Sequence, residues 1–310
     1  MENTRAKTTR NSLILLLTAT IWGMAFVSQS KGMDYMHPFT FNGVRSLIGA
    51  AGILVYILIS RKIAGDKAAK LDWKLNVRAG LLCGIFLTIA STLQQFGIKY
   101  TSVGKAGFIT TLYIIFVPMF GVFLKKKVAP VVWAAAGMAA VGMYLLCMTE
   151  SLRLGAGDIM VFLCAIAFAI QIMTVDHYAA RIDGAVVSCI QFTVCGVVCC
   201  IGALIWGQPT FGQIQEGLGA LLYAGVLSCG VGYTLQIVGQ KGLNPTVAAL
   251  IMSLESVIAT ISGWIAYKIG FLSTDQTLTP RQIAGCIIVF AAVILVQLPQ
   301  EWFRLGKKNA

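Results

Sequence analysis

The stretch TLQQFGIK, Thr92 to Lys99, is matched 142 residues later by TLQIVGQK, Thr234 to Lys241. The two stretches share a Thr-Leu-Gln triplet, a glycine and a lysine at the same spacing. Other pairings at nearby offsets agree: Trp22-Gly23 with Phe168-Ala169, Arg45 with Gln191, and Pro130 with Pro280. Self-similarity at a nearly constant offset is the signature of an internal repeat. The sequence therefore predicts two copies of one unit, residues 1–150 and 151–310.

Both copies consist almost entirely of apolar segments. The 310 residues are 57% hydrophobic and 12% charged, with a mean hydropathy of +0.80, whereas an ordinary soluble domain has roughly 25% charged residues. A helix of about twenty residues crosses the hydrocarbon core of a bilayer. Ten runs approach that length: 11–31, 37–59, 75–98, 106–124, 131–148, 158–178, 185–206, 217–239, 246–267 and 281–298. The sequence predicts an all-α integral membrane protein with ten transmembrane helices.

The number of spans in each copy determines how the copies are related. A chain that crosses the membrane five times begins its second copy from the opposite side, so the copies are inverted. Inverted repeats that meet at the bilayer midplane are the architecture by which secondary transporters alternate access. Lys and Arg number 17 on the side that holds both termini and 6 on the other side. We therefore expect a multi-pass protein of the cell (inner) membrane with both termini in the cytoplasm.

Charge, cysteine and histidine patterns argue against several other classes. The net charge of +12 is spread over short loops and both termini instead of one basic face, which speaks against nucleic-acid binding. Nine cysteines without a CxxC spacing, and two histidines near helix ends, predict neither a disulfide framework nor a metal site. The ATP-binding pattern G-x-x-x-x-G-K-S/T is absent from the sequence, and we expect no cofactor.

Glu255 lies within an apolar segment, LIMSLESVIATISGW at residues 250–264. It is about nine residues, or ~14 Å, into its span, where an ionised carboxylate costs about 2.5 to 3.5 kcal/mol. Such a residue faces the bundle interior and needs a proton, a water or a cation there. Arg45 lies ~12 Å deep in helix two, at a similar level. Two interpretations stay open: an ion pair that orders the bundle, or two groups that meet a substrate's charges in a hydrated cavity.

Glutamines and aromatic residues complete the candidate site. Gln94 and Gln236 occupy equivalent repeat positions near the ends of helices three and eight, where they would gate a cavity or cap backbone groups. Gln191 is the repeat equivalent of Arg45. Aromatic side chains would wall the cavity and stack on a flat or cationic substrate, or else face lipid; they are Trp22, Tyr113, Phe168, Tyr233 and Trp264. Pro118 alone lies well inside a span and predicts a kink, and hence a hinge, in helix four.

Four motifs can be compared with known families: Trp22-Gly23, the NGVR that ends at Arg45, YTSVGKAGFIT (residues 100–110) with Pro118 beyond it, and the SLES around Glu255. Together they resemble the drug/metabolite transporter superfamily, in particular its EamA-type ten-helix exporters. The resemblance covers residues 11–298. It implies a central cavity between helices one to four and six to nine, with helices five and ten peripheral. The family usually has proline after the helix-nine glutamate, and Ser256 in this position puts a kink of helix nine in question.

These features together predict a secondary transporter, and not an enzyme, that moves a small organic metabolite by alternating access. Glu255 would couple transport to a proton or a cation. One buried arginine is too few for polyphosphates or nucleotide sugars, whereas an amino acid, an organic cation or a neutral metabolite matches one positive and one negative group. The alternatives are an intramembrane lipid-modifying enzyme, which needs a nucleophile or a metal cluster at depth, and a passive channel. The oligomeric state is left open, a homodimer included.

Overall fold

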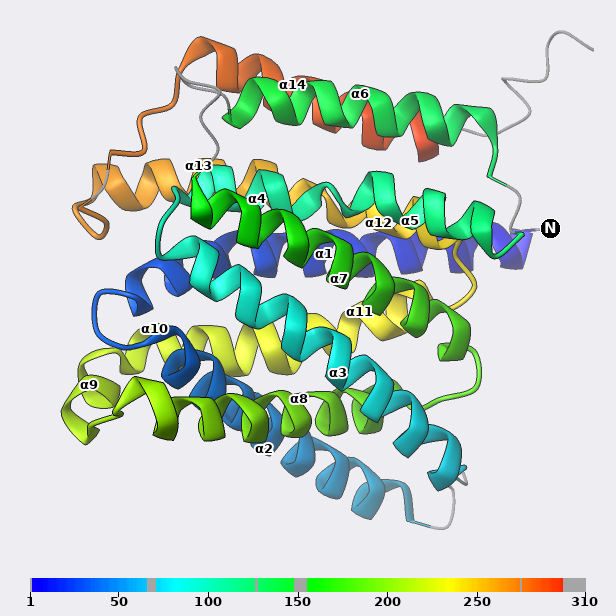
Figure 1. The fold of residues 1–310 in the computed structure, drawn as a ribbon. Helices are drawn as coiled ribbons and strands as arrows, with labels where there is room; N and C mark the ends of the chain where they lie inside the picture. The colour runs from blue at the N-terminus through cyan, green and yellow to red at the C-terminus, as the bar shows by residue number, and fades with distance from the viewer. Residues whose placement is uncertain (1, 66–70, 126–127, 148–154, 274, 298–310) are drawn as a thin grey trace, which may run out of the picture.

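The computed structural model describes residues 2–65, 71–125, 128–147, 155–273 and 275–297. This part of the chain is helical apart from short connections and contains no β-strand, and its helices run roughly along one direction (Figure 1). Eight of its helical segments are long and apolar enough to cross a membrane, and Pro130–Gly142 and Pro280–Leu295 are shorter apolar helices. The prediction of an all-α membrane fold with ten helical spans is confirmed.

The two halves have the same order of spans. The first half contains α1 (Glu2–Gly32), α2 (Pro38–Ala64), α3 (Trp73–Ile98), α4 (Val103–Thr111), α5 (Tyr113–Phe123) and α6 (Pro130–Cys147). The second half contains α7 (Ala156–Tyr178), α8 (Gly184–Gly202), η2 (Ala203–Gly207), α9 (Phe211–Glu216), α10 (Leu218–Leu222), η3 (Tyr223–Gly232), α11 (Tyr233–Gln240), α12 (Pro245–Met252), α13 (Leu254–Lys268) and α14 (Pro280–Gln297). The boundary predicted between residues 150 and 151 lies outside the described residues.

Helix starts follow capping chemistry that is visible in the sequence. Proline is the first residue of α2, α6, α12 and α14, a position whose backbone donor has no helical partner to lose. Asp72 accepts a hydrogen bond from the backbone N of Leu75 at 3.0 Å and so caps α3. Asn244 caps α12 through a 2.9 Å hydrogen bond from the backbone N of Thr246. Each cap satisfies a donor that the first helical turn leaves free.

The core of the bundle is an interface between the two halves. α2 packs on α8, α3 packs on both α7 and α8, and α1 packs on α13. Glycines make the closest approaches: a Cβ atom at Gly80 would lie 2.6 Å from Cβ of Ile190, and one at Gly43 would lie 2.7 Å from Sγ of Cys200. Small residues at helix contacts are the usual means of close packing in lipid. The two copies are therefore interdigitated and share one core.

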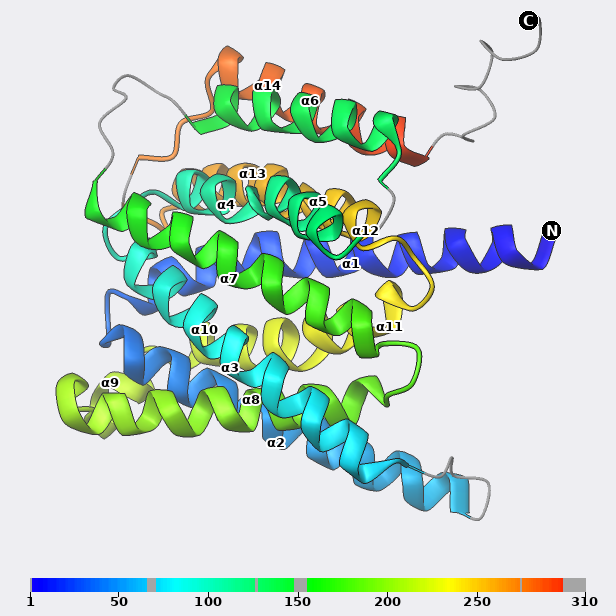
Figure 2. The same cartoon turned by 45° about the vertical axis from the view of Figure 1, so that its right-hand side comes forward.

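α6 and α14 pack against each other as a separate outer layer, at the top of Figures 1 and 2. A Cβ atom at Gly142 would lie 2.8 Å from the backbone O of Gly285, so the two helices are in close contact. Helices five and ten are thus peripheral, as the family resemblance implied. α1 begins and α14 ends on the same side of the bundle, at the right of both views. We call this the terminal side, and the other side the distal side.

Two spans have a local irregularity at neighbouring repeat positions. It lies at Leu112, between α4 and α5, in the fourth span and at Ser253, between α12 and α13, in the ninth; both residues keep right-handed helical backbone angles, so each span continues as one helix. Tyr113 follows Leu112 directly, and Glu255 follows Ser253 by two residues. Tyr113 and Glu255 are separated by 142 positions, the same offset as the Thr-Leu-Gln repeat, so they occupy equivalent positions beside the two irregularities.

Candidate functional site

A small cavity lies between the two halves at the centre of the bundle. The volume open to the centres of water molecules is about 30 Å³, and one water needs roughly 10 to 15 Å³ on this measure. The cavity therefore has room for about two waters and for no organic solute. Its lining comes from α1, α2, α3, α4, α5, α7, α8, η3, α11 and α13, so both halves contribute to it.

Eight of the ten predicted cavity residues line this cavity: Trp22, Arg45, Gln94, Tyr113, Phe168, Tyr233, Gln236 and Glu255. Gln191 lies behind the wall, where its Oε1 accepts a hydrogen bond from Nε2 of Gln171 at 3.4 Å. Trp264 does not line the cavity. It follows Glu255 by nine residues, which at about 100° per residue places it on the opposite face of the helix.

Glu255 is the carboxylate of the cavity. Its side chain is 4% exposed, and its Oε1 accepts a hydrogen bond from the hydroxyl of Tyr113 at 2.9 Å. Tyr113 is 2% exposed and begins α5, whereas Glu255 is the second residue of α13. A buried polar group in lipid has to be satisfied within the protein. The hydrogen bond therefore joins the fourth span of the first half to the ninth span, in the second half.

Two serine hydroxyls lie at the irregularity in the ninth span. Ser253 Oγ donates to the backbone O of Leu250 at 2.7 Å, and Ser256 Oγ donates to the backbone O of Ser253 at 2.8 Å. Serine hydroxyls that bond carbonyls in the preceding turn compete with the helical ladder and bend helices. The irregularity at Ser253 thus occurs without the proline that the family usually has. In the fourth span, Pro118 lies inside α5, six residues after Leu112. Its role as a hinge stays a prediction.

Arg45 lines the same cavity without pairing with Glu255. No carboxylate of the described residues lies within 4 Å of its guanidinium. Its Cζ is 5.4 Å from the ring centroid of Phe41, and its Nε is buried without a hydrogen-bond partner. The ion-pair interpretation does not describe this conformation, because depth alone does not bring two helices' side chains into contact. A buried guanidinium with an unsatisfied donor leaves a place for an acceptor group.

Glutamines that the sequence analysis did not select also face the cavity. Gln29 and Gln171 line it, and they are separated by 142 positions, so the repeat offset was a signal that could have found them. Gln236 Nε2 donates to Gln171 Oε1 at 3.2 Å, while Gln94 Nε2 donates to Thr110 Oγ1 at 3.1 Å. Gln94 and Gln236 therefore bond side chains, and neither caps a backbone group through the contacts of the described residues.

One wall of the cavity is aromatic. The ring centroids of Trp22 and Tyr233 are 4.5 Å apart, and those of Phe192 and Tyr233 are 5.0 Å apart. Trp22 Nε1 donates to the backbone O of Ser228 at 3.4 Å, within the π-helical segment η3. π-helical segments are rare and frequently occur at functional sites. The cluster provides a rigid apolar surface beside the charged residues.

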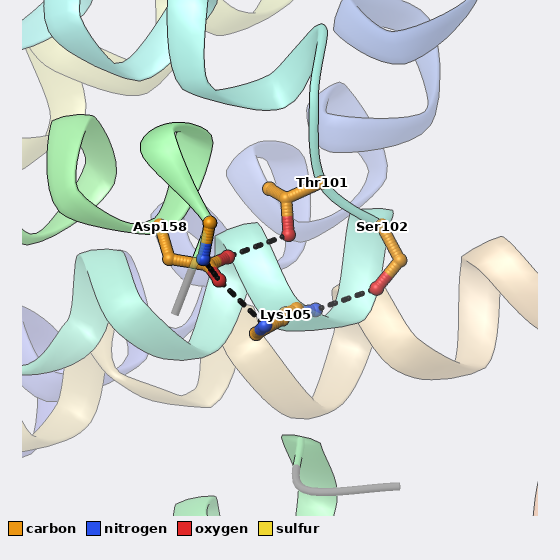
Figure 3. Close-up of polar contacts among 5 residues, drawn as sticks. Thr101, Ser102, Lys105 and Asp158 are labelled. Carbon is orange, nitrogen blue, oxygen red and sulfur yellow. Dashed lines mark hydrogen bonds and ion pairs between the residues drawn. The ribbon is translucent and has the colours of Figure 1, made fainter. Parts of the chain in front are cut away.

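Contacts between the halves hold the distal side together. Lys105 Nζ of α4 lies 2.6 Å from Asp158 Oδ2 of α7, and Thr101 Oγ1 donates to Asp158 Oδ1 at 2.9 Å. Figure 3 shows these groups converging on the Asp158 carboxylate, which also accepts a 2.9 Å hydrogen bond from the backbone N of Gly155. Asp158 thereby caps its own helix and pairs with the opposite half.

Neutral contacts join the halves on the terminal side. Asn11 Nδ2 of α1 donates to the backbone O of Lys241 at 2.7 Å, and Asn76 Oδ1 of α3 accepts from the backbone N of Asp183 at 2.9 Å. The cavity thus has a contact between halves on either side of it. Within the described chain, no group of three His, Cys, Asp or Glu side chains could hold a metal ion.

Comparisons with known proteins agree with this architecture. The model of the EamA-like transporter family matches residues 10–148 and, a second time, residues 155–298. An uncharacterized transporter of Archaeoglobus fulgidus is 28% identical over 290 residues, which are 92% of this chain and 84% of that protein. The uncharacterized transporter YwfM of Bacillus subtilis is 24% identical over 92% of this chain and 93% of its own. One solved crystal structure has a similar fold, with a TM-score of 0.73 at 16% identity over 96% of this chain and 99% of that one.

Proposed function

This chain belongs to the EamA-like transporter family, and from that premise we propose that it is a secondary transporter of a small organic metabolite. The observation that carries the proposal is Glu255. Its buried carboxylate lines a small cavity between two inverted halves and accepts a hydrogen bond from Tyr113 of the other half. Ionisable groups at this depth in a membrane mark pathways for solutes and ions. The solute passes through the cavity by alternating access.

The contacts on both sides of the cavity support an occluded step of such a cycle. The present cavity admits about two waters, so a solute enters only after the halves separate on one side. Separation on the distal side breaks the pair of Lys105 and Asp158. Separation on the terminal side breaks the hydrogen bond between Asn11 and Lys241. Inverted halves that exchange conformations produce these two openings in turn.

The substrate is a zwitterion such as an amino acid, with an organic cation as the second choice. The unpaired guanidinium of Arg45 suits a carboxylate, and Glu255 suits an ammonium group. The rings of Trp22 and Tyr233 suit a flat or cationic part of the solute. The predicted gating glutamines, Gln94 and Gln236, together with Gln191 behind them, would bond the remaining polar groups.

Orientation and coupling complete the proposal. The excess of Lys and Arg on the terminal side supports a cytoplasmic location of both termini in the inner membrane, and the family resemblance supports export. Glu255 binds a proton or a cation when the solute leaves. The transporter needs only its solute, the coupling ion and the bilayer as partners, while a homodimer stays an open expectation from the sequence.

Counterflow in proteoliposomes tests this function. We expect saturable exchange for at least one member of a panel of amino acids, organic cations and neutral metabolites, and faster flux under a pH gradient. Glu255→Gln should abolish the gradient-driven flux. Glu216→Gln, at an exposed glutamate of α9, is the matched control and should leave it unchanged. Flux of the Glu255→Gln variant that still follows the pH gradient would refute the coupling role. Absence of flux for every compound, together with chemically modified lipid, would favour an enzyme.

A further inference from the structure

A second, larger hollow lies on the terminal side of the bundle. This crevice has a volume of about 630 Å³ and is formed by the end of α2, the start of α3, the turn between α7 and α8, and the end of α11. It shares no lining residue with the central cavity. Because both halves border the crevice, a molecule bound there would contact residues of both halves.

Three cations from separate segments line the crevice: Arg61 at the end of α2, Arg181 after α7, and Lys241 after α11. Lys241 Nζ donates to the backbone O of Ile182 at 3.2 Å, and Arg181 Nη2 donates to the backbone O of His177 at 3.4 Å. Both cations thus retain donors that no described residue uses. The side chain of Arg61 has no hydrogen bond or ion pair with any residue in the described part of the chain.

Two carboxylates also border the crevice, and both are engaged in helix capping. Asp72 accepts from the backbone N of Leu75 at 3.0 Å. Asp183 accepts from the backbone N of Ala185 at 2.9 Å and of Val186 at 3.1 Å. Among the described residues that line the crevice, the three cations against these two carboxylates leave one net positive charge. The crevice therefore complements a single negative charge better than a dianion.

The wall of the crevice is apolar and continues into the membrane-facing surface. Tyr56, Ile57, Leu71 and Val238 line it beside the charged residues. No residue of α2 after Ile53 is buried, and Tyr56 is 61% exposed. In Figures 1 and 2 the end of α2 and the start of α3 stand away from the rest of the bundle at the lower right. A ligand with an anionic head and an apolar tail would match both parts of this surface.

We propose that the crevice binds one anionic glycerophospholipid from the adjacent leaflet. The phosphodiester lies against Arg61 and Arg181, and an acyl chain runs along the exposed face of α2. A phosphodiester carries one negative charge, which the net charge of the crevice balances. Basic pockets between membrane helices on the cytoplasmic side recognise lipid head groups in this way. This proposal does not depend on which solute the central cavity carries.

Native mass spectrometry of the detergent-solubilised protein, titrated with phosphatidylglycerol, tests the proposal. We expect one tightly bound lipid in the wild-type protein. A cation close to the membrane surface contributes about fivefold to lipid affinity, so Arg61→Gln with Arg181→Gln should weaken binding about 25-fold. The control is Lys62→Gln with Lys74→Gln, which removes the same charge from two exposed lysines that do not line the crevice. The control should bind as the wild type does.

Several outcomes would overturn the assignment. Equal binding by the Arg variant and the wild type, or an equal loss in the lysine control, would place the lipid elsewhere. Phosphatidylethanolamine that binds as tightly as phosphatidylglycerol would show that the negative charge is not recognised. Displacement of the lipid by millimolar inorganic phosphate would identify a soluble phosphate site instead. If the double Arg variant does not elute as folded protein, Arg181→Gln alone, at an exposed residue of the α7–α8 turn, should weaken binding about fivefold.

Discussion

Removal of the Lys105 ammonium should shift the protein toward a state that is open on the distal side. The pair of Lys105 and Asp158 is 2.6 Å long, with side chains 23% and 5% exposed. Exposed pairs contribute about 0.2 to 1 kcal/mol, whereas breaking a buried pair costs about 3 to 5 kcal/mol. Asp158 keeps its hydrogen bonds from Thr101 and Gly155, so we place Lys105→Gln between these limits, at about 2 kcal/mol. An energy of that size changes the ratio of open to closed protein about 30-fold.

Cys164 is a natural reporter of this opening. It lies on α7 six residues after Asp158, is fully buried, and its Sγ is 3.9 Å from Oγ1 of Thr110 on α4. A membrane-impermeant thiol reagent added to intact cells therefore labels Cys164 only when α4 and α7 separate. When opening is fast compared with labelling, the labelling rate follows the open population. Lys105→Gln should raise that rate about 10- to 30-fold, with Cys164→Ser as the background.

Two further variants make the labelling experiment decisive. The exchange of Lys105→Asp with Asp158→Lys restores an ion pair and should return the labelling rate toward that of the wild type. Lys99→Gln, at an exposed lysine on the same side, should leave the rate unchanged. An unchanged rate in Lys105→Gln would refute the view that this pair holds the distal side closed. An exchange variant that labels as fast as Lys105→Gln would refute a role for charge.

Two more substitutions test the cavity itself. Gly23→Ala should destabilise the protein by about 1 to 3 kcal/mol, because the new Cβ would lie 2.5 Å from Cβ of Ile258 and 2.8 Å from the backbone O of Glu255. Thermal unfolding in detergent measures this loss of stability. The control is Gly52→Ala, whose Cβ would have no atom within 4 Å and which should be as stable as the wild type. Equal stability of the two variants would argue against close packing at Gly23. Arg45→Gln should raise the substrate concentration for half-maximal counterflow while folded protein is retained, since no carboxylate is left unpaired. A failure to express folded Arg45→Gln would instead indicate a structural role.

The spans and the repeat were predictable because apolar length and sequence offset are properties of the chain alone. Ten runs could be recognised without any contact between them. The offset of 142 that relates Gln94 to Gln236 also relates Gln29 to Gln171 and Tyr113 to Glu255. A systematic use of this offset would have found two more cavity residues. Periodicity therefore carries information on the site as well as on the fold.

The sequence could not predict which helices pack side by side or which of their side chains meet. Arg45 and Glu255 share a depth, yet their side chains meet different neighbours because α2 packs on α8 whereas α13 packs on α1. The pair of Lys105 and Asp158 joins helices of opposite halves, so its formation depends on a tertiary interface that no local pattern encodes. The irregularity at Leu112, where the backbone N donates to the backbone O of Ile109 at 3.2 Å, likewise has no marker in the local sequence that we recognised.

The equivalence of Tyr113 and Glu255 limits the number of protons that the proposed transporter would carry in each cycle. The two repeats have similar backbones, but the equivalent position carries a phenol in one copy and a carboxyl in the other. At neutral pH a free phenol keeps its proton, whereas a carboxyl can exchange one. In the proposed transport cycle, these two equivalent positions therefore carry at most one proton per turnover, and the two half-cycles differ in chemistry although their scaffolds are alike.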